Sequence, residues 1–187
     1  MRICGLDEVG RGALAGPLIA AGVILNKPVA GLNDSKKLKY EIRNKIYERI
    51  INSGAEIETE IISARQINNR GMGWANKEIF RRLIRRSEAE RFIVDGNLKL
   101  GKMKNKTIKC VVRADKTRKC VMAASIIAKV TRDRLMRVLH TQHPKYDWEK
   151  NVGYGTKKHI EAIREFGVGK YHRSVYVTTA LSRDFPS

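Results

Sequence analysis

Acidic residues are scarce in this sequence of 187 residues, because 19 Asp and Glu stand against 38 Lys and Arg. The formal net charge is therefore +19 and the isoelectric point is near 10.2. So much positive charge calls for a polyanionic partner, with nucleic acid as the first candidate and an anionic membrane surface as the second. The composition, 42% hydrophobic and 30% charged, excludes fibrous and disordered classes of protein.

A long hydrophobic run is also missing. The longest apolar stretch, residues 17–25, is far shorter than the ~20 residues that a membrane-spanning helix needs. The N-terminal segment MRICGLDEVG has acidic residues where a signal peptide would have its apolar core. The three cysteines lack metal-ligand spacing and fit reduced thiols. We therefore expect a cytoplasmic protein without a membrane partner.

Several catalytic motifs are absent. The four histidines have no zinc-type spacing with cysteine, and the sequence contains neither HExxH, nor a P-loop, nor Gly-x-Ser-x-Gly. These absences argue against zinc hydrolases, P-loop nucleotidases and hydrolases with a serine nucleophile elbow. No internal repeat or Pro/Gly-rich linker divides the chain, which has the length of one domain.

The hydrophobic periodicity predicts an α/β domain with a mixed sheet flanked by helices. Expected strands cover residues 2–7, 18–25, 57–62, 92–95 and 107–112, and expected helices cover 35–50, 76–89, 120–140 and 156–166. In the first helix, Leu38, Ile42, Ile46 and Ile50 form one apolar stripe. Residues 171–187 are expected to pack as a short C-terminal helix, so that about residues 140–187 form a helical extension of one domain, 1–187.

Four carboxylates follow or end predicted strands: Asp7, Glu8, Asp95 and Asp115. A single Asp after a strand is most often a turn or helix-cap residue. In an open α/β sheet, however, the carboxyl ends of strands meet at one edge, so these distant residues can converge. Crowded carboxylates repel one another unless a cation joins them, and hard oxygen ligands suit Mg²⁺ or Mn²⁺. The pattern favours two-metal hydrolysis of a phosphodiester.

Three further segments are candidates for substrate contact. The turn Gly10-Arg11-Gly12 offers exposed amides and a charged side chain, although it could be merely a tight turn between strands. Tyr154, between two glycines, could lie on a sugar or base, or could be a loop tyrosine of the core. Ser35, Lys36 and Lys37 begin a predicted helix, either as a cap followed by exposed lysines or as phosphate contacts.

Positive charge is concentrated in the second half of the chain. Residues 96–187 carry 21 basic and 7 acidic side chains, a net charge of +14, against +5 for residues 1–95. Residues 99–119 hold nine basic side chains and one acid, Asp115. This stretch is the densest part of the electrostatic footprint that the sequence predicts for a polyanion.

The ordered motifs resemble those of the bacterial type 2 ribonuclease H family, ribonuclease HII. The motifs are GLDEVGRGALAGPL at 5–18, DSKKL at 34–38, IVDGN at 93–97, RAD at 113–115, AASIIAKVTRDRLM at 123–136 and GYGT at 153–156. Ala13, Arg113 and Ala114 depart from residues that are frequent in the family, and the stretch 67–74 looks unusual. None of these departures removes an acidic residue.

The resemblance implies an RNase H-like fold and an endonuclease that cuts the RNA strand of RNA–DNA hybrids. It also implies cleavage on the 5′ side of single ribonucleotides in duplex DNA, which leaves a 3′-OH and a 5′-phosphate and serves DNA repair. By matching motifs, Asp7, Glu8, Asp95 and Asp115 would hold two Mg²⁺ or Mn²⁺ ions. The resemblance implies that the turn at residues 10–12 contacts the ribose 2′-OH. It also implies that Tyr154 lies against the following deoxyribose and that the lysines after Asp34 contact phosphates.

Two other hypotheses stay open on the sequence. A basic protein could bind nucleic acid and cut nothing, its acids being structural. A different two-metal nuclease on the same fold, such as a resolvase-like enzyme, could cut DNA without ribose. For either nuclease we expect a monomer.

Overall fold

The computed structural model describes residues 2–33 and 38–182 and contains one five-stranded sheet. The strands are β1 (Ile3–Val9), β2 (Leu18–Ile24), β3 (Glu56–Ile62), β4 (Arg91–Asp95) and β5 (Thr107–Val111). Their order is β3-β2-β1-β4-β5, with β1, β4 and β5 parallel to one another and β2 antiparallel to β1 and β3. The mixed sheet is the one expected from the sequence, and each strand lies within two residues of its predicted bounds.

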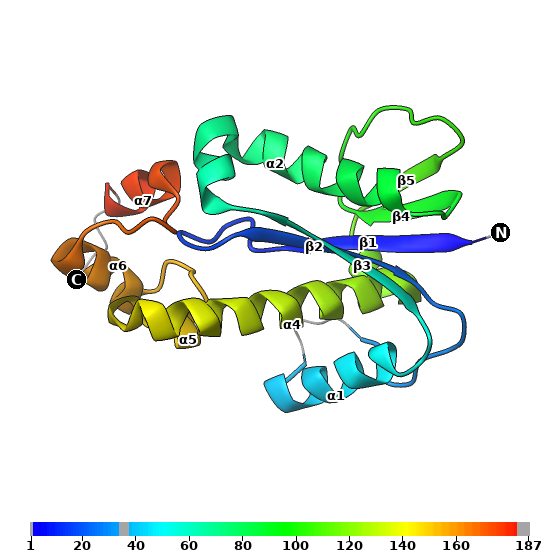
Figure 1. The fold of residues 1–187 in the computed structure, drawn as a ribbon, viewed down its shortest axis with the longest axis horizontal. Helices are drawn as coiled ribbons and strands as arrows, with labels where there is room; N and C mark the ends of the chain where they lie inside the picture. Colours follow the sequence, from blue (N-terminus) through cyan, green and yellow to red (C-terminus); the bar gives the residue numbers. More distant parts are fainter. Residues whose placement is uncertain (1, 34–37, 183–187) are drawn as a thin grey trace.

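Helices cover both faces of the sheet (Figure 1). One face is covered by α2 (Ala64–Arg86), and the other is covered by α4 (Lys119–Gln142) with α1 (Tyr40–Ile51) packed beyond it. The short α3 (Ala114–Thr117) joins β5 to α4. Each strand alternates its side chains between the two faces, so β1 gives Cys4 and Leu6 to the core under α2 and Val9 to the core under α4.

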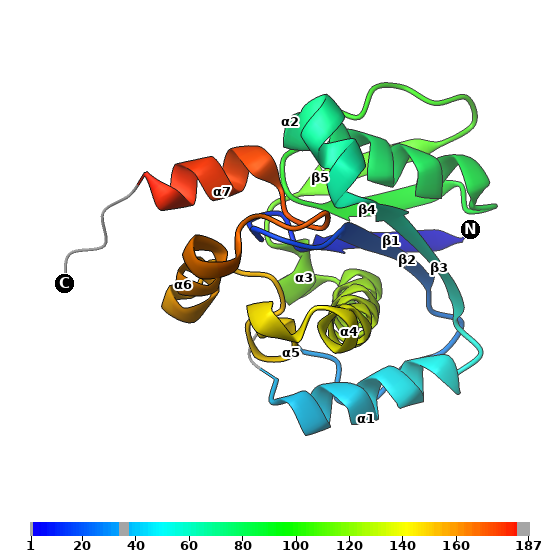
Figure 2. The same ribbon diagram turned by 60° about the vertical axis from the view of Figure 1, so that its left-hand side comes forward.

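The chain after α4 is helical and lies beyond the end of β1 (Figure 2). It contains the 3₁₀ turn η1 (Pro144–Tyr146), α5 (Trp148–Asn151), α6 (Lys157–Phe166) and α7 (Ser174–Leu181). A third core joins these helices to Leu14 and Ala15, which follow β1, and to Met136 of α4. The C-terminal helices are thereby packed against the loop that leaves β1. No helix in the described parts of the chain is long and apolar enough to cross a membrane.

The predicted apolar stripe of the first helix is only half right. Ile46 and Ile50 are buried, but Ile42 is 47% exposed. A spacing of four residues advances 400° around a helix, so each step turns the stripe by a further ~40° and Ile42 is rotated away from the core. Leu38 precedes the helix and packs, partly buried, against the core under α4. The half-buried Arg43 instead approaches Asp133 of α4, with Nη1 and Oδ2 3.6 Å apart. The helix is assigned from Tyr40, and residues 34–37 lie outside the described residues.

The second predicted helix begins twelve residues too late. It was expected at 76–89, whereas α2 starts at Ala64 behind a capping box in which Ser63 and Gln66 exchange hydrogen bonds. Gly71 and Gly73 lower the helix propensity of the first part, which hides it from the periodicity. Gly71 in fact interrupts the helix with φ of 79° and ψ of 157°.

Candidate active site

Asp7 and Asp95 lie on neighbouring parallel strands and point to the same face of the sheet. The register places Gly5 beside Ile93 and Leu6 beside Val94, so the next positions of β1 and β4 are Asp7 and Asp95. Strand alternation directs both carboxylates away from the core under α2, toward α4. Asp7 is only 6% exposed.

Asp115 reaches the same edge through a sharp turn after β5. Arg113 has a left-handed backbone, with φ of 59°, and starts the short helix α3. The Asp95 Oδ1 atom accepts hydrogen bonds from the N–H of Ala114, at 2.6 Å, and from the N–H of Asp115, at 3.4 Å. The carboxylate of Asp95 thus fixes the backbone of Asp115, which is itself buried.

The electrostatics at Asp7 are those of crowded carboxylates. Burial raises the pKa of Asp7 well above its ordinary value of 3.8, and the charges of Glu8 and Asp95 raise it further. A hydrogen bond from Ser125 of α4 and one from the N–H of Glu8, at 2.8 Å, act in the opposite direction. The Arg11 Nη1 atom lies 3.8 Å from Oε1 of Glu8 and forms a salt bridge with it.

The turn at residues 10–12 begins one residue after the acidic pair, and two buried arginines hold the turn and the loop that follows it. Arg173, from the segment before α7, donates to the carbonyls of Gly10 at 2.6 Å, Arg11 at 3.0 Å and Gly16 at 3.0 Å. Arg132 of α4 donates to three further carbonyls, those of Ala15, Pro17 and Val152, at 3.1, 3.0 and 2.8 Å. Both arginine side chains are fully buried, so these bonds compensate charges that would otherwise be costly to bury.

Sequence reasoning missed both arginines. Burial lowers the pKa of each, to about 10 for Arg173, which leaves the Arg173 guanidinium charged at neutral pH. One signal could have revealed Arg132: it lies four residues from the buried Ala128 and Met136, on the apolar face of α4. Arg173 has no comparable local signal.

Tyr154 follows Gly153, which is bonded to the same loop. The carbonyl of Gly153 accepts hydrogen bonds from the N–H groups of Leu14 and Ala15, at 2.8 and 3.1 Å. The guanidinium of Arg132 lies 5.4 Å from the centre of the Tyr154 ring. The turn at residues 10–12 and the half-buried Tyr154 are therefore joined through the loop that follows β1, which is bonded to Gly153 and to Arg173, beside Asp7 and Glu8. The other predicted substrate residues, Ser35, Lys36 and Lys37, lie outside the described residues.

Comparison with known proteins shows which family the whole chain resembles. A family model described as Ribonuclease HII matches residues 4–179. The chain belongs to the ribonuclease HII family. It is 44% identical over 176 residues to the ribonuclease HII of Wolbachia sp. subsp. Drosophila simulans (strain wRi), covering 91% of this chain and 87% of that protein. It is 41% identical over 184 residues to the ribonuclease HII of Aliarcobacter butzleri (strain RM4018), covering 97% and 94%.

Solved structures of the ribonuclease HII and HIII families have the same fold. The structure of the PCNA:RNase HII complex from Archaeoglobus fulgidus matches with a TM-score of 0.83 and 26% identity, covering 92% of this chain and 94% of that one. Bst-RNase HIII in complex with Mn²⁺ matches with a TM-score of 0.75 and 22% identity, covering 97% and 70%. The expected RNase H-like fold is confirmed, and the chain is a ribonuclease H, an endonuclease that cleaves RNA in RNA–DNA hybrids.

Proposed function

We propose that this ribonuclease HII also cuts duplex DNA on the 5′ side of single embedded ribonucleotides, leaving a 3′-OH and a 5′-phosphate. Asp7, Glu8, Asp95 and Asp115 are the proposed catalytic residues and the ligands of two divalent ions, Mg²⁺ or Mn²⁺. The observation that carries the proposal is the meeting of β1, β4 and α3 at one sheet edge, with Asp95 bonded to the N–H of Asp115. The solved RNase HIII complex with Mn²⁺ supports divalent ions as cofactors.

The donor set fits such ions. All four side chains are carboxylates, which are hard oxygen ligands, and the crowding at Asp7 is the kind that a cation relieves. Among the described residues, no three His, Cys, Asp or Glu side chains converge closely enough to hold an ion by themselves. Mg²⁺ commonly needs only one or two carboxylates, because water and substrate phosphate complete its shell. Divalent ions bound there would supply Lewis-acid stabilisation of charge on phosphate oxygens and water of lowered pKa.

The protein's own groups orient these carboxylates before substrate arrives. Ser125 and the N–H of Glu8 hold Asp7, and the N–H of Ala114 holds Asp95, so neither side chain needs to be ordered at the moment of reaction. The turn of Gly10, Arg11 and Gly12 would test for the 2′-OH, the group by which a protein tells RNA from DNA. Tyr154 would lie on the following deoxyribose, and Ser35, Lys36 and Lys37 would contact phosphates.

The proposed role is removal of ribonucleotides from DNA during replication and repair, by a monomer in the cytoplasm. A duplex with one ribonucleotide and an all-DNA duplex of the same sequence should be incubated with Mg²⁺, with Mn²⁺ and with EDTA. We expect a cut 5′ of the ribose with either ion or both, and none in EDTA or in the all-DNA duplex. Cleavage of the all-DNA duplex would instead indicate a DNA nuclease.

Replacing Asp7 should separate catalysis from stability. Asp7→Asn should lower the cleavage rate roughly 100- to 1000-fold. In EDTA the variant should melt at a higher temperature, because a buried carboxyl with a raised pKa costs stability when it is ionised at neutral pH. Mn²⁺ should raise the melting temperature of the wild type more than that of the variant.

The matched control is Glu88→Gln, which removes one negative charge from a side chain that is 87% exposed. It should leave cleavage and the response to Mn²⁺ unchanged. Full activity in Asp7→Asn, or an equal loss in Glu88→Gln, would refute the assignment of Asp7.

A further inference from the structure

A second concentration of positive charge lies away from the carboxylates. A recess of about 560 Å³ opens between α2 and the loop that joins β4 to β5. Its charged lining residues, here called the basic recess, are Arg81, Arg85, Lys102, Lys104 and Lys106. Among the described residues, its lining contains no acidic side chain. These lysines belong to the basic stretch that the sequence singles out, and the catalytic proposal uses none of them.

The loop that carries these lysines is fixed to the body of the protein. Leu100 is buried, and its carbonyl accepts a hydrogen bond from Arg81 Nε at 3.1 Å. Lys106 Nζ donates to the carbonyls of Ser87 at 2.7 Å and Ala89 at 2.8 Å. The loop therefore presents its charges from a preformed frame, which lowers the entropic cost of binding a ligand.

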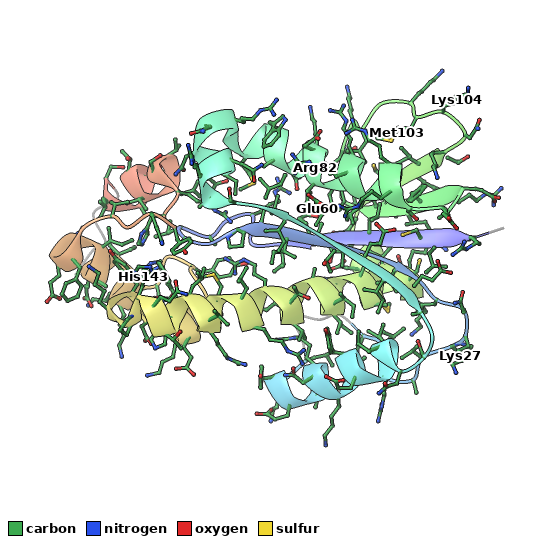
Figure 3. All side chains as sticks on the ribbon, in the orientation of Figure 1. Lys27, Glu60, Arg82, Met103, Lys104 and His143 are labelled. Atoms are coloured by element: carbon green, nitrogen blue, oxygen red, sulfur yellow. The ribbon has the colours of Figure 1, made fainter. Side chains whose placement is uncertain are left out.

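The free charges of the recess are those of Lys102 and Lys104. Both are exposed, and neither forms a hydrogen bond or an ion pair with any described residue (Figure 3 labels Lys104 on the loop). Arg81 and Arg85 are one helical turn apart, a spacing at which like charges repel each other. Arg81 and Lys106 hold the loop through hydrogen bonds, but Lys102 and Lys104 make no such contact with the described residues, so a polyanion would neutralise charges that the fold does not use.

The basic recess lies on the α2 side of the sheet and the carboxylates face α4, so a nucleic acid held at the carboxylates would reach the recess by passing the edge strand β5. Arg91, at the start of β4, pairs with Thr107, which directly follows Lys106. From Arg91 to Asp95 the strand spans about 13 Å, a distance that roughly four phosphates cover along one strand of a duplex. β5 is the edge strand, and its exposed Lys109, paired with Ile93, lies between the recess and Asp95.

We infer that the basic recess binds the sugar–phosphate backbone of the substrate duplex, several nucleotides away from the cleavage site. That the polyanion is nucleic acid rests on the ribonuclease activity. Lys102 and Lys104 contact phosphates, and Lys106 and Arg81 hold the loop in place. The contact reads no base, so it adds affinity and dependence on duplex length without adding sequence preference.

The test compares binding to two duplexes that each contain one ribonucleotide, in EDTA, where no cleavage is expected. In the short duplex, about three base pairs lie on each side of the ribonucleotide, and hairpin loops close both ends. In the long duplex, about fifteen base pairs lie on each side. In the double variant Lys102→Gln/Lys104→Gln, affinity for the long duplex should fall about tenfold, and the slope of log affinity against log salt should become shallower by about two. Affinity for the short duplex should not change.

The matched control is Lys27→Gln/Lys45→Gln, which removes two exposed positive charges that do not line the recess, one in the loop after β2 and one on α1 (Figure 3 labels Lys27). It should bind both duplexes as the wild type does. Equal losses in the two double variants would attribute the effect to net charge and overturn the inference. Loss of binding to anionic vesicles, with duplex binding intact, would also overturn it, in favour of a membrane surface.

Cleavage with Mn²⁺ separates this inference from the proposed function. The Lys102→Gln/Lys104→Gln variant should cut the short duplex at the wild-type rate and the long duplex with a higher KM. If the wild type cuts neither duplex, the proposed function is refuted. The binding measurements alone then test whether the basic recess binds the duplex. If the wild type cuts both duplexes and the variant cuts each with the same rate and KM, only the inference about the basic recess is refuted.

Discussion

Gly10 and Gly12 are separated by one residue, yet the structure places different demands on them. Gly10 has φ of 92°, and a Cβ atom there would lie 2.3 Å from Arg132 Nε. At Gly12 a Cβ atom would meet nothing within 4 Å. The first glycine is therefore required by the fold, and the second is required only if a substrate approaches its backbone closely.

Alanine at the two positions should separate these effects. Gly10→Ala should lower the free energy of unfolding by about 1–3 kcal/mol, because it combines backbone strain with a clash. Gly12→Ala should unfold like the wild type but cut at ribonucleotides more slowly. Thermal unfolding and cleavage of the single-ribonucleotide duplex measure the two effects. Wild-type activity in Gly12→Ala would show that the turn does not approach the sugar.

At the scale of elements, α2 combines a helix start with an interruption. Gly71 has φ of 79° and ψ of 157°, a conformation essentially restricted to glycine, whereas no positive φ occurs at Gly73. A Cβ atom at either position would meet nothing within 4 Å. Differences between alanine variants at these positions therefore reflect the backbone alone. Asn68, in the first part of α2, donates to the carbonyl of His172 at 3.0 Å, so the interruption sets where this part of α2 meets the C-terminal segment.

We expect Gly71→Ala and Gly73→Ala to have opposite signs. Gly71→Ala should destabilise the protein by about 1–3 kcal/mol, since alanine is strained at that φ and ψ. Gly73→Ala should stabilise it by up to about 1 kcal/mol, the difference in helix propensity. Urea denaturation at neutral pH measures both values. Equal effects of the two variants would mean that α2 is not interrupted at Gly71.

At the scale of the whole molecule, buried histidines join the C-terminal helices to the segment that contains Tyr154. His159 Nε2 accepts from Trp148 Nε1 at 3.0 Å and lies 3.2 Å from His172 Nε2, and His159 Nδ1 lies 2.9 Å from the carbonyl of Tyr154. His172 Nδ1 accepts from the N–H of Gly169 at 2.9 Å. This pattern requires both imidazoles to be neutral, with the proton of His159 on Nδ1 and that of His172 on Nε2.

The histidines should make the protein sensitive to acid. Burial, with a smaller contribution from His159, lowers the pKa of His172 from 6.5 to about 4. The unfolded chain takes up a proton below pH 6.5 that the folded chain does not, so stability should fall by about 3 kcal/mol between pH 6.5 and pH 4. Asp7 acts in the opposite direction, because its raised pKa adds stability as pH falls. Denaturation of Asp7→Asn at several pH values isolates the histidine effect, and a flat profile would contradict it.

Much of the fold and of the candidate site could be predicted from the sequence because the signals are local. Alternation, β-branched enrichment or, in β2, a continuous apolar run marks each strand within five to seven residues, and Asp7 and Asp95 were expected at strand ends for that reason. The motifs that carry the family resemblance are also continuous segments. Signals of this kind lie in neighbouring residues and do not require knowledge of which elements meet.

Contacts between distant segments were decided by the tertiary structure alone. Arg173 bonds to the carbonyl of Gly10 across 163 residues of sequence, and nothing near either residue encodes that pairing. The strand register sets Asp7 beside Asp95, and the packing of Arg81 against Leu100 forms the basic recess. The sequence by itself determined which side chains are available for chemistry and binding. Only the packing of whole elements decided which of them meet, because that choice depends on the summed burial of many residues.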